Sequence, residues 1–144
     1  LPTAEAHYLL GMMDKAQGNV QAAFDHFKAA AGSDSEAGKK ANAEMVRLEL
    51  SNNPSKYIAS RAAVDPDNTV WAQFLNRTTV PVRDIEISYA WLDDAGQTRQ
   101  GKRRFSGPLK GGEQNQLSLG IRIGNAEDLS RRVRVEVTAA RVAE

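Results

Sequence analysis

The sequence predicts an α+β fold, in which an N-terminal helical hairpin and a capping helix precede an antiparallel β-sandwich of about six strands. Two observations support this prediction. Apolar residues recur at helical spacing over residues 1–54, whereas they alternate with polar residues over residues 55–144. Helices and strands that occupy separate stretches form segregated layers, so we expect two subdomains, 1–54 and 55–144.

Two helices form the predicted hairpin. The first spans residues 4–16, with Thr3 as its N-cap, and Gly18 ends it because glycine readily adopts the left-handed conformation that follows many helices. The second spans residues 20–31, with Asn19 as its N-cap. The apolar positions expected to pack the hairpin are Ala6, Leu9, Leu10 and Met13 on the first helix, and Val20, Ala23, Phe24, Phe27, Ala30 and Ala31 on the second.

A third helix is predicted from the capping-box spacing of Ser33 and Glu36, and it runs to about residue 50. Pro54 then closes the helical half, because proline disfavours helix in the residue before it. The apolar stripe of this helix consists of Ala37, Ala41, Met45 and Leu48.

Strands are predicted throughout the second subdomain. Alternation is clearest where Ile85, Ile87, Tyr89 and Trp91 share one face. The tetrapeptide Asp-Asp-Ala-Gly at residues 93–96 follows and predicts a hairpin turn, since Asp and Gly tolerate the dihedral angles of tight turns. The predicted strands are 57–64, 70–75, 84–91, 97–105, 116–123 and 132–142.

The composition excludes several classes of protein. Cysteine is absent, which rules out disulfides, thiolate zinc sites and cysteine nucleophiles in this chain. No stretch approaches the roughly 20 consecutive apolar residues that cross a bilayer, so we expect no membrane insertion. The net charge of +1 combines −2 over residues 1–54 with +3 over residues 55–144, which is too even to predict nucleic-acid binding from charge alone. The chain begins at Leu1 and not at a methionine, so we expect a fragment or a matured product.

The residues that carry chemistry form no recognisable constellation. His7 and His26 are the only histidines, and a zinc site needs a third ligand and usually a histidine pair at i, i+4. Asp93 and Asp94 are explained by the hairpin turn, although paired carboxylates also serve acid–base chemistry or cation binding. We therefore predict no catalytic residue, no cofactor, no metal site and no enzymatic activity.

Basic residues form the most suggestive clusters of the second subdomain, because such clusters bind nucleic acid or anionic lipid. Alternation splits them, however. Arg132 and Arg134 are expected on one face of their strand, and Lys102 and Arg104 on another. Pairing with acidic residues across strands makes a solvated sheet face or a protected edge strand the simpler interpretation. The candidate anion-binding residues are Arg99, Lys102, Arg103, Arg104, Arg131, Arg132 and Arg134, and their acidic partners are Glu86, Asp93, Asp94 and Glu136.

Residues 4–35 resemble one tetratricopeptide repeat. The positions that carry the resemblance are Leu10, Gly11, Ala23, Phe27 and Ala30. In that family, residues of these sizes set the close crossing of the two helices. Gly11 and Ala23 leave room for near contact. Leu10 and Phe27 are expected to fill the seam between the helices.

Three positions depart from the family pattern, namely His7, Asp14 and Ser35. Asp14 weakens packing onto a following repeat, so the resemblance implies the last repeat of an array, with the third helix as its cap. In tetratricopeptide proteins the first helix of each repeat lines the concave ligand face. The resemblance therefore implies a protein-binding groove at Glu5, Tyr8, Met12 and Lys15.

The second subdomain is similar to the FxLYD-type immunoglobulin-like domains of bacterial envelope proteins. The stretches that carry the similarity are 71–78, 82–91, 94–96 and 108–112. The resemblance implies structural roles, in which Asn76 bonds the backbone of the corner after its strand and Gly112 supplies a positive φ. It also implies a periplasmic or envelope location, although a chain without cysteine fits the cytoplasm equally.

Repeats followed by such a sandwich also look like the C-terminal extension of bacterial membrane-associated zinc metallopeptidases, whose His-Glu-x-x-His motif is not in this sequence. The favoured hypothesis is a non-catalytic protein-interaction or scaffold module of a larger bacterial envelope protein. Its partner would be a protein or peptide, or an upstream domain of the same chain. The alternatives are a regulatory or substrate-recruiting tail of a zinc metallopeptidase, and a binder of nucleic acid or anionic surfaces.

Overall fold

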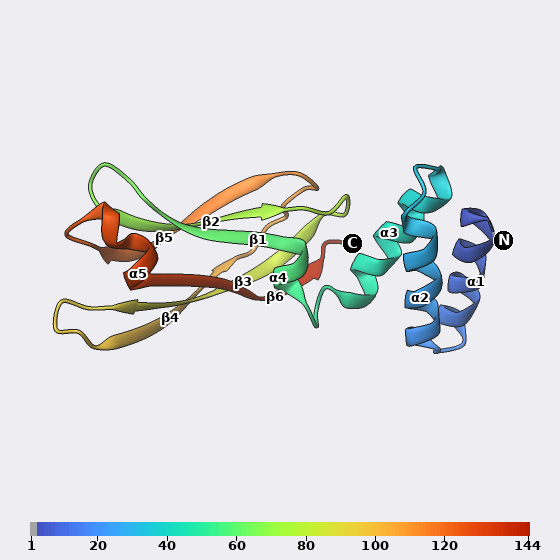
Figure 1. The fold of residues 1–144 in the computed structure, drawn as a ribbon, viewed down its shortest axis with the longest axis horizontal. Helices are drawn as coiled ribbons and strands as arrows, with labels where there is room; N and C mark the ends of the chain where they lie inside the picture. Colours follow the sequence, from blue (N-terminus) through green and yellow to red (C-terminus); the bar gives the residue numbers. More distant parts are fainter. Residues whose placement is uncertain (1–2) are drawn as a thin grey trace. The chain divides into compact units, whose positions relative to one another are not determined.

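Helices come first and strands follow in the computed structural model, which describes residues 3–144 (Figure 1). This order confirms the α+β fold class. The chain divides into two compact units, one ending at Glu49 and the other beginning at Leu50, whereas the sequence placed the boundary after residue 54. The difference arises because a short helix, α4 (Pro54–Tyr57), packs on strands of the second unit.

The three long helices of the first unit are α1 (Ala4–Ala16), α2 (Val20–Ala31) and α3 (Glu36–Glu49). The first two have the predicted bounds. The Thr3 hydroxyl oxygen accepts a hydrogen bond from the Ala6 amide at 3.1 Å, which confirms its role as N-cap. Gly18 has a φ of +80°, the left-handed conformation expected after the end of α1.

The other two predicted caps fare differently. Asn19 is the N-cap residue of α2, as predicted, but its side chain makes no capping hydrogen bond, and the cap predicted for α3 is wrong. The predicted box assigned the cap of α3 to Ser33, whereas the Ser35 hydroxyl accepts from the Gly38 amide at 3.2 Å. The reason is that α3 begins at Glu36, so Ser35 is the residue immediately before its first turn.

The core of the helical unit forms around Phe27, which is fully buried with Ala23, Ala30 and Ala41. The ring of Phe27 lies against Gly11 of α1, where a Cβ atom would come within 2.6 Å of the ring. Glycine at this position therefore allows α1 and α2 to approach closely, as the sequence predicted.

The predicted packing face of α1 is wrong. The side chains that contact the core are those of Ala4, Tyr8 and Met12, which lie one turn apart on the helix. Because α2 and α3 both pack on that side of α1, the side that carries Leu10 and Met13 is left uncovered. Leu10 consequently does not fill the seam with Phe27.

The second unit is a β-sandwich of two three-stranded antiparallel sheets. One sheet has the order β1-β2-β5 and the other β4-β3-β6 (Figure 1). The strands are β1 (Ile58–Val64), β2 (Thr69–Asn76), β3 (Val82–Leu92), β4 (Thr98–Phe105), β5 (Gln114–Arg122) and β6 (Val133–Val142).

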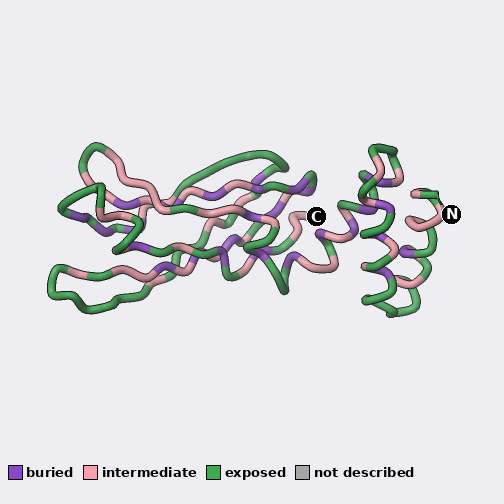
Figure 2. Tube along the Cα trace, in the orientation of Figure 1, coloured by how far each residue is buried: buried purple, intermediate pink, exposed green. Residues whose placement is uncertain are grey.

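Alternation of buried and exposed residues marks the inner face of each sheet (Figure 2). On β2 every second residue from Val70 to Asn76 is buried, and on β3 Ile85, Ile87 and Tyr89 are buried, as predicted. Short helical turns replace the first residues predicted for two strands. Tyr57 belongs to α4, and Arg132 ends a one-turn helix, α5 (Leu129–Arg132), which follows a 3-10 turn, η1 (Ala126–Asp128).

A buried asparagine holds the corner after β2. Asn76 has no solvent exposure, and its Nδ2 donates to the carbonyl oxygens of Val80 at 2.8 Å and Leu109 at 3.1 Å. Its Oδ1 accepts from both the amide and the hydroxyl of Thr78. The side chain thus bonds the corner backbone, and Gly112 has a φ of +79°, as the sequence predicted for both residues.

The β1–β2 turn is organised by the carboxylate of Asp65. It accepts from the indole N–H of Trp71 at 3.0 Å and from the amides of Asp67 and Thr69. The hydrogen bond from Trp71, followed by that from Thr69, holds the pKa of Asp65 below its ordinary value.

A depressed pKa makes the turn sensitive to acid. The stabilisation from charged Asp65 is complete above the pKa of an unfolded aspartate, about 3.9, and is lost as the pH falls through the lower pKa of the folded state. Replacing Trp71 by phenylalanine removes the hydrogen bond that lowers the pKa of Asp65 most, so we expect this pKa to rise. An NMR titration of the Asp65 carboxyl carbon measures this, and an unchanged midpoint in W71F would contradict it.

Candidate functional site

An apolar surface is exposed on the helical hairpin. Four large aliphatic side chains are solvent-exposed there, namely Leu9 (54%), Leu10 (41%), Met13 (58%) and Val20 (53%). Leu9, Leu10 and Met13 lie on one side of α1, since positions i, i+1 and i+4 fall within one sector of a helix. Val20 begins α2 next to the hairpin turn. We call Leu9, Leu10 and Met13 the α1 face.

The α1 face stands out against the rest of the molecule. Among residues 3–144, the other large hydrophobic side chains that are comparably exposed stand singly, namely Val20 at the start of α2 and Leu92 in the second unit. Single exposed apolar residues are ordinary on protein surfaces, whereas a contiguous group marks an interaction surface. The α1 face is therefore the candidate site that the helical unit offers.

The four residues predicted to form a groove do not lie together. Glu5 and Tyr8 line an open groove of about 670 Å³ between the start of α1 and the turn that joins α2 to α3. Met12 packs against the buried cluster around Phe27. The Lys15 ammonium binds the carboxylate of Glu44. The groove is thus shorter than the sequence implied.

Glu44 of α3 accepts two charged hydrogen bonds, one from Lys15 of α1 and one from Arg47 of α3 itself. The distance from Lys15 Nζ to Glu44 Oε2 is 2.6 Å, and that from Arg47 Nη1 to Glu44 Oε1 is 2.9 Å. Glu44 is one of the few charged residues that are buried, so both of its carboxylate oxygens have a cationic partner. Lys15 therefore has a structural role.

The structure brings the two histidines together. The Nδ1 atoms of His7 on α1 and His26 on α2 are 3.2 Å apart, and the other ring nitrogen of His26 lies 3.5 Å from the carboxylate of Asp14. The sequence reasoning missed this pair because the residues face each other across the hairpin and not along one helix. Within residues 3–144, no group of three or more histidine, cysteine and acidic side chains is placed to hold a metal ion.

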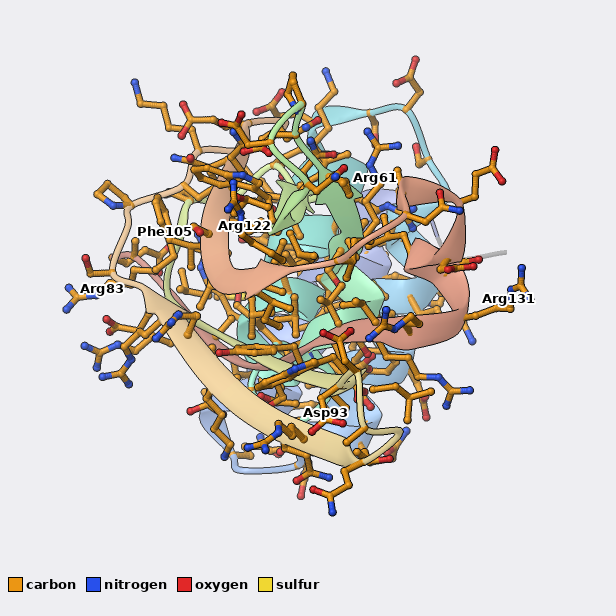
Figure 3. The ribbon with its side chains drawn as sticks, turned by 90° about the vertical axis from the view of Figure 1, so that its left-hand side faces the viewer. Arg61, Arg83, Asp93, Phe105, Arg122 and Arg131 are labelled. Carbon is orange, nitrogen blue, oxygen red and sulfur yellow. The ribbon has the colours of Figure 1, made fainter. Side chains whose placement is uncertain are left out.

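Most of the candidate anion-binding residues are neutralised by acidic partners. The ion pairs among them are Arg99–Asp93, Lys102–Glu86, Arg131–Asp128 and Arg132–Asp94. Three of the four predicted acidic partners, Glu86, Asp93 and Asp94, thus pair as expected. Seen end-on, Arg61, Arg83 and Arg131 project from different sides of the sandwich, so positive charge is dispersed (Figure 3).

The predicted separation of the basic clusters onto different faces is wrong. Arg132 lies in α5 and not on a strand. Its guanidinium donates to the carbonyl oxygen of Leu92 at 2.7 Å. Ser88 of β3 is paired with Lys102 on one side and Glu136 on the other, and Ala90 is paired with Arg134. Lys102 and Arg134 therefore share one face of the β4-β3-β6 sheet, because β3 lies between their strands.

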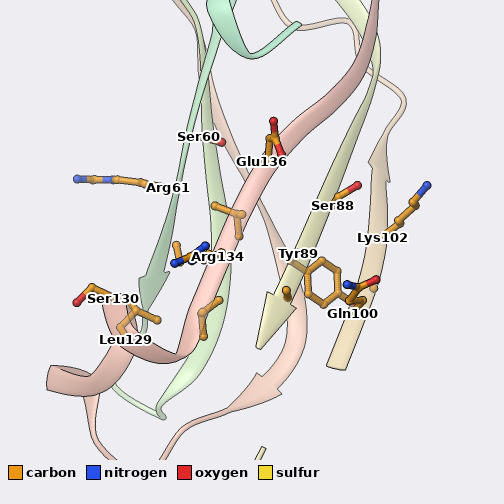
Figure 4. A pocket seen from close by; sticks show the side chains of 15 residues that line it. Ser60, Arg61, Ser88, Tyr89, Gln100, Lys102, Leu129, Ser130, Arg134 and Glu136 are labelled. Atoms are coloured by element: carbon orange, nitrogen blue, oxygen red, sulfur yellow. The ribbon is translucent and has the colours of Figure 1, made fainter. Parts of the chain in front are cut away.

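An open groove of about 1020 Å³ runs along this part of the sandwich (Figure 4). Its lining comes from β1, β3, β4, α5 and β6 and includes charges of both signs. Arg61, Lys102 and Arg134 contribute cations, and Glu136 contributes an anion. Mixed charge is typical of a solvated sheet face and does not favour a dedicated anion site.

The carboxylates of the β3–β4 turn are accounted for by the turn itself. Asp93 accepts from the amides of Ala95 and Gln97, and Gly96 has a φ of +78°. The Arg99 guanidinium, 2.8 Å away, holds the pKa of Asp93 below its ordinary range, which keeps this carboxylate charged. Asp94 is paired with Arg132.

Comparisons with known proteins do not assign this chain to a family. No protein-family model and no curated protein matches it. Among solved structures, the putative ApaA protein from Bordetella pertussis is similar at 14% identity and a TM-score of 0.31, over 44% of this chain and 62% of that one. A DUF1425 family member from Shewanella sp. pv-4 is similar at 17% identity and a TM-score of 0.27, over 60% of this chain and 75% of that one. Both TM-scores are low, so neither likeness bears on function.

Within residues 3–144, no helix is both long enough and apolar enough to cross a bilayer.

Proposed function

We propose that this chain is a non-catalytic protein-interaction module whose α1 face binds an amphipathic helix of a partner protein. The observation that carries the proposal is the group of exposed apolar side chains at Leu9, Leu10 and Met13 on one side of α1. Full burial of such a side chain contributes about 1.5–3 kcal/mol, so covering three half-exposed ones contributes roughly 1 kcal/mol each. This contribution offsets only part of the loss of translational and rotational freedom on association, so the partner must add further contacts around the α1 face.

The geometry of the α1 face favours a helix as the occupant. Leu9 and Met13 are one turn apart, and anchors at helical spacing are the pattern of helix-on-helix recognition. Ala6 and Ala16, about one turn before Leu9 and after Met13, are small, which permits a close approach of a second helix at these two positions.

A lipid surface fits less well. Helices that lie on membranes carry Lys and Arg beside their apolar face. The one Lys or Arg side chain of α1 is that of Lys15, which binds Glu44 on the opposite side of the helix. The partner is therefore proposed to be a protein.

The two resemblances add to the proposal. The close contact of Gly11 with Phe27 supports a tetratricopeptide-like hairpin, and stacking of helices on such hairpins is how those proteins extend. The Asn76 corner and the Gly112 bend support an FxLYD-like sandwich. On that resemblance, the parent protein is proposed to belong to the bacterial envelope.

Adjacent methionines on α1 provide a matched test. Met13 is exposed and Met12 packs against the core, so we expect M13Q to change the free energy of unfolding by less than about 0.5 kcal/mol and M12Q to lower it by about 1–3 kcal/mol. Denaturant unfolding followed by circular dichroism measures both. Equal losses in the two variants would show that the α1 face belongs to the core of the fold.

Binding is tested by NMR with two synthetic peptides of the same composition. One places its leucines at helical spacing and the other alternates them. We expect the helical peptide to shift the methyl signals of Leu9, Leu10 and Met13, and L9Q/M13Q to abolish the shift of Leu10. Shifts spread evenly over the protein, or the same response to both peptides, would refute the proposed surface.

A further inference from the structure

The histidine pair of the hairpin has a geometry that its role in packing does not require. His7 and His26 direct their Nδ1 atoms at each other across 3.2 Å, and their ring centroids are 5.4 Å apart. The two rings come from antiparallel helices whose crossing is fixed by the Gly11–Phe27 contact. The two nitrogens are therefore held in position by the rigid part of the unit.

The distance between the two Nδ1 atoms matches the distance between two imidazole nitrogens that bind the same metal ion. Metal–nitrogen bonds to zinc are about 2.0–2.1 Å long. Two such bonds to atoms 3.2 Å apart enclose an angle of roughly 100° at the metal, which is close to the tetrahedral angle. The 3.2 Å contact is a hydrogen bond between the rings, so each ring must turn by roughly 40° from the line that joins the nitrogens before one ion can bind both Nδ1 atoms.

Asp14 supplies the outer partner that metal-binding histidines usually have. Its Oδ2 lies 3.5 Å from Nε2 of His26, so it favours the tautomer with the proton on Nε2 and the lone pair on Nδ1. His7 needs only to carry its own proton on Nε2 for both lone pairs to face the ion. The His26 side chain is 32% exposed, which gives an ion access from solvent.

We propose that His7 and His26 bind one divalent transition-metal ion of the Zn²⁺, Ni²⁺ or Cu²⁺ class through their Nδ1 atoms, with Asp14 orienting His26. The chain supplies two ligands, and the remaining positions are left to water or to a group from a partner. Imidazole is a good ligand for these ions and a poor one for Ca²⁺ and Mg²⁺. The site is independent of the α1 face, which includes none of these residues.

Calorimetric titration of the tag-free protein with Zn²⁺ tests the proposal. We expect saturable binding of one ion per chain, and no binding of Mg²⁺. H7N and H26N should each abolish the binding, because one imidazole alone cannot chelate. D14N should weaken it about tenfold, the loss typical when an outer carboxylate is removed. In the ¹H–¹⁵N spectrum of the rings, Zn²⁺ should shift both Nδ1 signals, and it should also shift the Nε2 signal of His7, because the proton of that ring moves from Nδ1 to Nε2.

Asp25 provides the matched control. It is next to His26 in the sequence, but its carboxylate accepts from Gln21 at 3.1 Å. D25N should leave the affinity unchanged, and circular dichroism should show that every variant is folded. The proposal is overturned if the wild type shows no saturable binding, if H7N or H26N still binds one ion, or if D25N weakens binding as much as D14N.

Discussion

Replacing Asn76 by aspartate is expected to lower the free energy of unfolding by about 3–5 kcal/mol at neutral pH. The substitution changes the shape of the side chain very little. It puts a carboxylate oxygen where the Nδ2 group now donates to Val80 at 2.8 Å and to Leu109 at 3.1 Å. A buried negative charge would then face two carbonyl oxygens, which is among the most unfavourable arrangements in a protein interior.

The effect should depend on pH in a defined direction. Burial and the facing carbonyl oxygens raise the pKa of the introduced carboxyl above that of an unfolded aspartate, about 3.9. The destabilisation should therefore grow as the pH rises through and beyond this value and be smaller at pH 4 than at pH 7. Denaturant unfolding of N76D at the two pH values measures it.

Asn115 is the control for this prediction, since it is exposed on β5 and its Oδ1 accepts only from the adjacent Gln116 amide. N115D should change the free energy of unfolding by less than about 0.5 kcal/mol. A loss in N76D as small as that in N115D would mean that the corner does not depend on the Asn76 hydrogen bonds.

Replacing Gly11 by alanine should destabilise the helical unit by about 1–3 kcal/mol, although alanine favours a helix interior over glycine by about 1 kcal/mol. The new Cβ would lie 2.6 Å from Cε1 and 2.7 Å from Cδ1 of Phe27, whose ring is fully buried and has no free space to move into. The helices would have to separate, which loosens the contact on which the hairpin is built.

Gly32 offers a matched control. A Cβ there meets nothing within 4 Å, and its φ of −70° suits any residue. G32A should therefore leave the helical signal in thermal unfolding unchanged or raise its midpoint. If G11A gained stability in the same way, the close crossing of α1 and α2 would be wrong.

The bounds of the hairpin helices could be predicted from the sequence because the residues that determine them act locally. The bounds of α1 and α2 follow from helical periodicity together with Thr3 and Gly18, each of which acts on its own neighbours. Asn76 was likewise predictable, because the FxLYD-type resemblance placed a bonding asparagine at that corner.

The side of α1 that is buried could not be predicted from the sequence, because apolar residues occur on most sides of this helix. Tyr8 and Met12 form one apolar side, and Leu9 and Met13 form another. Which side is covered depends on where α3 packs, and that is settled by distant residues. The pairing of His7 with His26 depends in the same way on how the two helices cross, so no spacing along the chain reveals it.

The central claim, that the α1 face is a docking surface for a partner helix, is tested most directly by site-specific photo-crosslinking in cells of the source organism. A photoreactive residue is placed at Leu9, Leu10 or Met13, and at the exposed control positions Gln21 and Lys28 of α2. We expect adducts only from the three α1 positions, loss of the Leu10 adduct when L9Q and M13Q are added, and attachment to the apolar face of a helix in the partner. Adducts that form equally at Gln21 and Lys28, or none from α1, would contradict the account.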